Sequence, residues 1–231
     1  MKTINSFPYP WPYDGDISPK NTALIVIDMQ HDFCGEGGFL ESMGYDISEA
    51  KKVINPIKKL LEELRTLNYP IIHTREGHQP DLSDLPENKR WRTARNGAEI
   101  GSLGSLGRIL IRGEKGWDII PELYPIEGEP IIDKPGKGAF FATDLDQILK
   151  LKGIKNLIFV GLTTDVCVTM SLREANDRGY ECILLEDCCA ASEIENHKNA
   201  IKNISLQNGI FGTIYNSVDF IKELKEITNE N

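Results

Sequence analysis

The chain has 231 residues, a formal net charge of -9 at pH 7 and a sequence pI near 5.0. This acidic balance argues against nucleic acid or an anionic membrane surface as the main partner, because both are polyanions. No apolar run approaches the length that spans a bilayer, and 40% hydrophobic residues are enough for one globular domain with a sizeable core.

The first predicted unit is an N-terminal arm, residues 1–21 (MKTINSFPYPWPYDGDISPKN), which is polar and rich in proline and aromatic residues. It lacks the apolar stretch of a secretory leader. We expect an irregular arm that packs over the surface or against a neighbouring subunit. A single domain is expected to follow from residue 22 to residue 231.

Short apolar, β-branched runs alternate with helical patterns along the rest of the chain. Six runs predict buried strands, at residues 23–28, 70–74, 130–134, 156–160, 181–186 and 212–215. Alternation at this spacing is typical of βαβ units. We therefore expect an α/β fold with one parallel sheet of about six strands and helices on both of its faces.

Helical periodicity predicts the segments between these strands. Ser48 is expected to cap a helix over residues 49–67, in which Pro56 is expected to produce a kink. Further helices are predicted at residues 143–151, 165–178, 195–207 and 218–227. The stretch 75–116 is polar and punctuated by proline and glycine, and it is too long for a simple connection, so it predicts a functional loop.

The cysteines are odd in number and irregularly spaced, and none forms a C-x-x-C pair: Cys34, Cys167, Cys182, Cys188 and Cys189. The pattern favours reduced thiols and a cytoplasmic protein.

Three reactive residue types follow the predicted strands. The first strand ends in Asp28 and the third in Lys134, and the fourth leads through the turn GLTTDVCV to Cys167. Because ligands of parallel sheets bind beyond the carboxyl ends of the strands, an acid, a lysine and a thiol are expected at one edge of the sheet.

These groups suit acyl transfer from an amide through a thioester. A thiol in the first turn of a helix, close to a cation and a base, ionises more readily and attacks carbonyl carbons. Asp28 can accept the thiol proton, and Lys134 can stabilise both the carboxylate and the thiolate. The free N–H groups of the turn before the helix can hold the oxyanion that forms.

Each residue also has a simpler interpretation. Cys167 can be a packing residue at a strand–helix junction, Asp28 a helix cap, and Lys134 a solvated cation. The residues alone leave these alternatives open.

Three segments resemble the motifs of the isochorismatase-like cysteine hydrolases: IVIDMQHDF (25–33), KPGKGAF (134–140) and GLTTDVCV (161–168). The resemblance implies that Asp28, Lys134 and Cys167 are catalytic. It also implies a cis peptide bond between Leu162 and Thr163, which directs the backbone N–H groups of Thr163 and Cys167 at the oxyanion. Assembly into dimers or tetramers is a further implication of the family.

Within this family, Cys167 favours an amidohydrolase over enzymes that cleave a vinyl ether. The metal pattern of the nicotinamidases, Asp-x-His followed by His, is absent after the second strand. His73 and His78 could bind a metal together with Glu76 or Asp81, but we interpret them as hydrogen-bonding residues. We therefore predict neither a metal nor a cofactor.

Other segments resemble the biuret-hydrolysing branch of the family, among them YPWPY (9–13), HTREGH (73–78), NKRWR (88–92) and GWDIIPELY (116–124). The resemblance implies hydrolysis of biuret to allophanate and ammonia. The residues expected to bind this small ureido substrate are Gln207, Phe33, Thr163, Arg75 and Glu76. Lys137, close to the catalytic lysine, is interpreted as a loop cation.

Two alternatives remain. The first is an amidohydrolase for ureidoacrylate, triuret or another N-carbamoyl compound. A substrate of this kind that carries a carboxylate requires a cation in the pocket, such as Arg75 or Arg92. The second is a non-catalytic binding protein, which has no need of the complete set of Asp28, Lys134 and Cys167.

Overall fold

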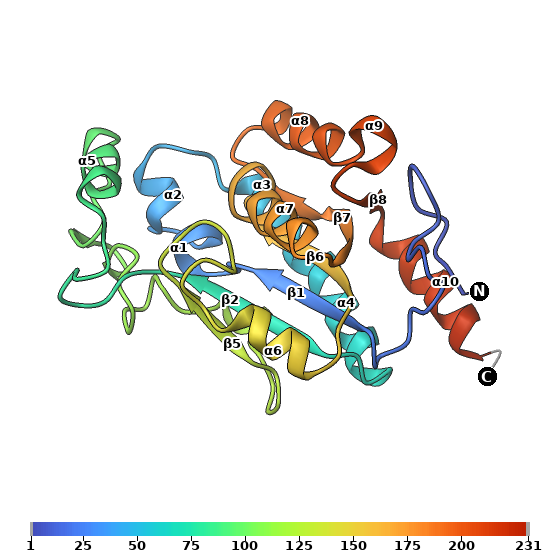
Figure 1. The fold of residues 1–231 in the computed structure, drawn as a ribbon. Helices are drawn as coiled ribbons and strands as arrows, with labels where there is room; N and C mark the ends of the chain where they lie inside the picture. Colours follow the sequence, from blue (N-terminus) through green and yellow to red (C-terminus); the bar gives the residue numbers. More distant parts are fainter. Residues whose placement is uncertain (1, 230–231) are drawn as a thin grey trace.

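The computed structural model describes residues 2–229 (Figure 1). Six strands form one sheet in the order β5-β2-β1-β6-β7-β8, and every neighbouring pair among them is parallel. The strands are β1 (Thr22–Ile27), β2 (Ile71–Glu76), β5 (Ile131–Lys134), β6 (Asn156–Leu162), β7 (Glu181–Ala190) and β8 (Thr213–Tyr215). The predicted α/β fold with a six-stranded parallel sheet is confirmed.

Helices cover both faces of this sheet (Figure 1). One layer holds α4 (Ile54–Thr66) and α10 (Ser217–Asn229), and the other holds α6 (Leu145–Leu151), α7 (Thr169–Asp177) and α8 (Ile194–Ile204). Strand β1 shows why two layers are needed. Its side chains alternate between the faces, so Leu24 and Val26 pack in the first core while Ala23, Ile25 and Ile27 pack in the second.

The strand order places a switch point between β1 and β6. From β1 the chain builds outward through β2 to β5, and it then returns to add β6 on the other side of β1. The loops after β1 and β6 therefore leave in opposite directions and open a crevice at the carboxyl ends of these strands.

The region predicted as one kinked helix contains two helices, α3 (Ser48–Lys52) and α4. Ser48 is the first helical residue, and the Asp46 carboxylate accepts its N–H at 2.8 Å and its hydroxyl at 2.9 Å. The predicted Ser48 cap is therefore wrong. Pro56 is the third residue of α4, and the helical segment is interrupted at Val53, between α3 and α4. Pro56 has no N–H to donate to the carbonyl of Lys52, so the expected disturbance of the helix at Pro56 is confirmed as this break.

The long segment after β2 contains structure that the sequence did not indicate. It forms α5 (Glu87–Arg95) and a short hairpin of β3 (Leu103–Gly104) and β4 (Gly107–Arg108). Figure 1 shows α5 set apart from the layered core. None of the α5 residues in the structure is buried, so this helix has no apolar face that a periodicity argument could detect.

The N-terminal arm packs against its own chain. Ile4 and Trp11 are fully buried and pair with each other, and Trp11 lies 6.5 Å from Phe220 of α10 between ring centroids. Phe7 pairs with Ile214 on the outer edge of β8. The arm therefore covers the β8 end of the sheet.

All five cysteines are free thiols. Within residues 2–229, no helix combines the length and the apolar character needed to cross a bilayer.

Candidate active site

Four reactive side chains meet at the carboxyl ends of adjacent strands. Asp28 follows β1, Glu76 ends β2, and Lys134 ends β5. Cys167 lies in a π-helical turn, Thr164–Val168, that follows β6 and leads into α7. All four are buried, and because their strands are neighbours in the order β5-β2-β1-β6, residues far apart in the chain converge.

Asp28 and Lys134 form a fully buried ion pair. The Lys134 ammonium lies 2.6 Å from Asp28 Oδ2 and donates to the carbonyls of Gly136 and Lys137 at 3.0 and 2.9 Å. The Thr74 hydroxyl donates to Asp28 Oδ1 at 2.5 Å. Burial favours the neutral carboxyl and raises the pKa of Asp28, and the lowering effect of Lys134 does not fully offset it. The Asp28 carboxylate is therefore more basic than an ordinary aspartate and is suited to accept a proton.

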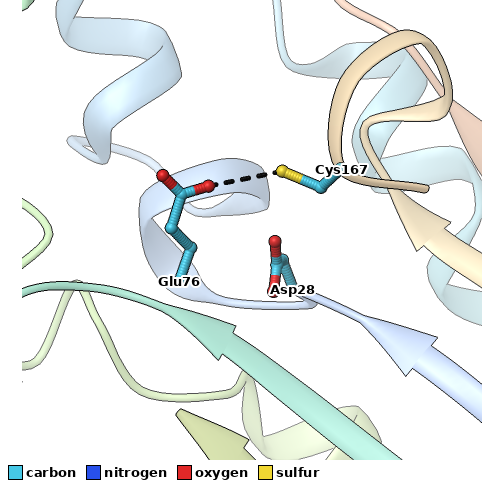
Figure 2. A group of neighbouring side chains, drawn as sticks. All are labelled: Asp28, Glu76 and Cys167. Atoms are coloured by element: carbon cyan, nitrogen blue, oxygen red, sulfur yellow. Dashed lines mark hydrogen bonds between the residues drawn. The ribbon is translucent and has the colours of Figure 1, made fainter. Parts of the chain in front are cut away.

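Cys167 faces Glu76 (Figure 2). The thiol donates to Glu76 Oε2 with a distance of 3.3 Å between sulfur and oxygen. Burial raises the pKa of Cys167 well above its ordinary value, while Lys134 lowers it and the two nearby carboxylates raise it further. The resting sulfur is therefore a protonated thiol, which requires a base before it can attack.

Glu76 is surrounded by ammonium groups. Its Oε1 lies 2.7 Å from Lys89 and 2.8 Å from Lys137, and its Oε2 lies 3.6 Å from Lys134. Burial alone would raise the pKa of Glu76, but these lysines lower it well below its ordinary value. Glu76 therefore stays ionised, and the pKa shifts of the two carboxyl groups have opposite directions. Its main-chain N–H and C=O are held by the Gln30 side chain at 2.7 and 3.0 Å.

Two of the four, Cys167 and Glu76, line a cavity of about 490 Å³, and Lys134 lies 3.6 Å from Glu76 and 2.6 Å from Asp28. Cys167, Glu76 and Lys137 line the cavity from the strand ends, and Phe33 lines it from α1 (His31–Cys34). Another part of the wall comes from α5, which contributes Asn88, Lys89, Arg92 and Thr93, and from Asn96, which directly follows the helix. The cavity therefore combines a nucleophile with several cations.

The cis peptide expected from the family motif is present between Leu162 and Thr163. Thr163 and Cys167 both line the cavity. Their roles as oxyanion donors stay a prediction.

Two residues expected to bind substrate lie elsewhere. Arg75 points to the other side of β2, where its guanidinium donates to Asp118 and Asp133 at 2.8 Å each. The guanidinium carbon also lies 3.6 Å from the centroid of the Trp117 ring. Gln207 is exposed on α9 (Leu206–Gly209) with a left-handed φ of 50°. Neither residue is in the cavity wall of this chain, so the cavity gives no support to these two predictions.

The histidines considered as metal ligands have protein partners. His73 Nε2 bonds Glu129 at 3.0 Å, and His78 bonds Asp84 through Nδ1 at 3.2 Å and Lys89 through Nε2 at 2.9 Å. Asp28, Glu76 and Cys167 do bring potential ligand atoms within 4.8 Å of one another. However, the Lys134 ammonium already supplies a positive charge to both carboxylates. The donor set therefore fits an ion-paired site better than a metal centre.

The chain is similar in sequence to a known protein family and to several of its members. The family model described as "Isochorismatase domain" matches residues 22–215. Ureidoacrylate amidohydrolase RutB of Agrobacterium fabrum is 35% identical over 179 residues, which cover 74% of this chain and 76% of the relative. The RutB protein of Acinetobacter baylyi is 32% identical over 216 residues, covering 89% and 84%.

Solved structures agree with these relatives. A cysteine hydrolase from Pseudomonas syringae pv. phaseolicola superposes with a TM-score of 0.79 at 25% identity, covering 98% of this chain and 99% of that one. N-carbamoylsarcosine amidase from Thermoplasma acidophilum gives a TM-score of 0.65 at 28% identity, covering 85% and 96%.

Proposed function

The chain belongs to the isochorismatase family, and from this premise we propose that it is a cysteine amidohydrolase. Its substrate is a small ureido compound that carries a carboxylate, with ureidoacrylate as the first candidate, and the bond cleaved is the terminal C–N bond.

The observation that carries the proposal is that Cys167, which lines the cavity, meets the buried ion pair of Asp28 and Lys134. Thioester chemistry requires three groups. They are a thiol, a carboxylate that can accept its proton, and a fixed ammonium group. A binding protein has no need to bury this set, because removing even paired charges from water costs desolvation free energy.

The reaction follows from these positions. Asp28 accepts the thiol proton while the Cys167 sulfur attacks the ureido carbonyl carbon and forms the S–C bond. The proton then passes from Asp28 to the terminal nitrogen, the C–N bond breaks, and ammonia leaves. Lys134 stabilises Asp28 whenever that carboxylate is charged, and the predicted N–H donors of Thr163 and Cys167 hold the oxyanion.

The second half of the cycle regenerates the thiol. Asp28 removes a proton from water, and the resulting hydroxide attacks the thioester carbonyl. The C–S bond breaks, the sulfur recovers the proton from Asp28, and the N-carboxy product leaves.

The cations of the cavity favour a substrate with a carboxylate. Arg92, Lys89 and Lys137 line the cavity. Lys89 and Lys137 already pair with Glu76, so Arg92 is the cation proposed to hold a substrate carboxylate by charge-assisted hydrogen bonds. Biuret has no such group, and Gln207, which was expected to recognise it, lies outside the cavity wall. The names of the sequence relatives favour the same choice.

The test is ammonia release from the purified protein with ureidoacrylate, N-carbamoylglycine, biuret and nicotinamide. We expect the highest kcat/KM with the two ureido carboxylates. Cys167→Ala should lose activity by about 10⁴-fold or more without a change in far-UV circular dichroism. Equal kcat/KM values for Cys167→Ala and the wild type would contradict the thioester mechanism. A higher kcat/KM with biuret than with the two ureido carboxylates would contradict the proposed need for a substrate carboxylate.

A further inference from the structure

The two oxygens of Glu76 have different environments. Oε1 is held by Lys89 and Lys137 at 2.7 and 2.8 Å. Oε2 faces the Cys167 sulfur at 3.3 Å, with Lys134 at 3.6 Å. The lysines on Oε1 fix the orientation of the carboxylate, so Oε2 remains directed at the reacting sulfur (Figure 2).

The mechanism described above assigns no role to this second carboxylate. Asp28 already serves as the base, with its own partners in Lys134 and Thr74. An anion 3.3 Å from the sulfur opposes formation of a thiolate. A fully buried group of this kind, held by ammonium groups at the reacting atom, is expected to make a compensating interaction with the substrate.

We propose that Glu76 Oε2 accepts a hydrogen bond from the leaving nitrogen of the ureido group. In the empty site the Cys167 thiol donates to this oxygen. In the substrate complex the terminal N–H takes its place, and the thiol turns to Asp28. This inference rests on the proposed function, because it concerns the same sulfur and the same cleaved bond.

The role fits the charge that develops during cleavage. When Asp28 transfers its proton to the terminal nitrogen, that nitrogen becomes more positive and the C–N bond breaks. Glu76 keeps its charge throughout and stabilises the N–H groups of the departing ammonia. It accepts no proton and forms no covalent bond, so the atoms and electrons of the reaction remain balanced.

The chemical consequence is selectivity for a leaving atom that bears hydrogen. A leaving group –NH–CH3 offers Glu76 one N–H, whereas –O–CH3 has nearly the same shape and offers none. With the ester, the buried anion faces an oxygen lone pair and loses its partner. Sites built around such a hydrogen bond reject the analogue that lacks it.

The experiment compares these two leaving groups on the same ureido carboxylate scaffold. The ratio of kcat/KM for the N-methyl compound to that for the O-methyl compound is measured in the wild type and in Glu76→Gln. We expect the substitution to lower the ratio by about 10- to 100-fold, the range for losing a hydrogen bond to a charged group. Taking the ratio within each protein removes the different intrinsic reactivity of the two compounds.

Glu193→Gln is the matched control, because it removes an exposed carboxylate at the rim of the same cavity. This variant should keep the wild-type ratio. Glu76→Asp retains the charge but moves it away from the sulfur, so its ratio should fall between those of the wild type and Glu76→Gln.

A second measurement needs no substrate. Alkylation of Cys167 by iodoacetamide is followed against pH, and Glu76→Gln should become reactive at lower pH than the wild type, because a negative charge has left the neighbourhood of the sulfur. This measurement reports the charge of Glu76 beside the sulfur, and the ratio of kcat/KM values remains the test of its contact with the leaving nitrogen. The alkylation experiment also gives a result if Glu76→Gln is too unstable for steady-state assays, because the folded protein is exposed to iodoacetamide only briefly and at low temperature.

The outcomes separate the two proposals. If the wild type releases no ammonia from any ureido compound, the proposed function fails and this inference fails with it. If the wild type is active and Glu76→Gln retains the wild-type ratio, only this inference is overturned.

Discussion

Two regions that border the same cavity are built in opposite ways. The strand-end group, Asp28, Glu76, Lys134 and Cys167, is buried and held at the ends of four adjacent strands. Helix α5 has no buried residue in the structure, yet it supplies a second wall of the cavity. The strand-end group cannot change without disturbing the core. Lys89 is tied to the strand-end group because it pairs with Glu76. We propose that Arg92, another cavity residue of α5, contributes to the choice of substrate.

The largest effect on activity and stability is expected from a substitution of Lys134, a fully buried member of the strand-end group. Lys134→Met should abolish ammonia release and also lower the free energy of unfolding by about 3–5 kcal/mol, because it leaves Asp28 and Glu76 buried beside a missing cation. Urea denaturation measures the loss of stability. Lys150→Met is the control, since its ion pair with Asp146 is exposed and such pairs contribute about 1 kcal/mol or less. Equal stability of the two variants would contradict the structural half of this argument.

Asp32 connects α1 to the long segment that follows α5. It lies in α1, directly after the strand-end residues of β1, and its Oδ2 accepts the N–H of Leu110 from the long segment at 3.0 Å. Burial raises the pKa of Asp32 to about 6, although the backbone N–H groups of Leu110 and Phe39 lower it. At a pH between these two pKa values, Asp32 is therefore protonated in the folded protein, whereas in the unfolded chain, with its ordinary pKa of 3.8, it has already released the proton.

This difference fixes the sign of a pH effect on stability. Between about pH 4 and pH 6 the native state binds more protons at Asp32 than the unfolded state does, so the free energy of unfolding falls as pH rises. The total change from this group is at most about 3 kcal/mol. Asp32→Asn should flatten the curve over this window in urea denaturation series. A wild-type slope that survives the substitution would assign the effect to another group.

The sequence predicted the strand-end group better than its surroundings, for a physical reason. Apolar runs identify buried strands, and the polar residue that ends each run is then placed at the carboxyl edge. This argument was sufficient for Asp28 and Lys134. It was less successful on β2, because the strand runs on to Glu76 and its side chains alternate between faces. Arg75 and Glu76 cannot both face the cavity, and alternation from Thr74, which contacts Asp28, selects Glu76.

The α5 wall lies beyond what periodicity can reveal. Its sequence, ENKRWRTAR, has no apolar stripe, and Lys89 is positioned by long-range contacts with Glu76, His78 and the Pro135 carbonyl. Gln207 illustrates the opposite error. The predicted helix continued through it, but α8 ends at Ile204 and the chain turns away with left-handed φ values at Gln207 and Asn208.

The smallest expected effect tests the role of α5 in substrate choice. Arg92→Met should raise KM for ureidoacrylate by about 10- to 100-fold, the usual loss for a hydrogen bond between charged groups, with little change in the KM for neutral biuret. Arg95→Met is the matched control on the same helix, because Arg95 stacks on Trp91 at 4.8 Å and is not part of the cavity wall. If both variants raise KM equally, or if Arg92→Met weakens both substrates alike, α5 acts through general charge or folding. A shift confined to Arg92 and to the carboxylate substrate would mean that an exposed residue of α5 sets specificity for a reaction whose thiol, acid and ammonium are buried beyond the strand ends.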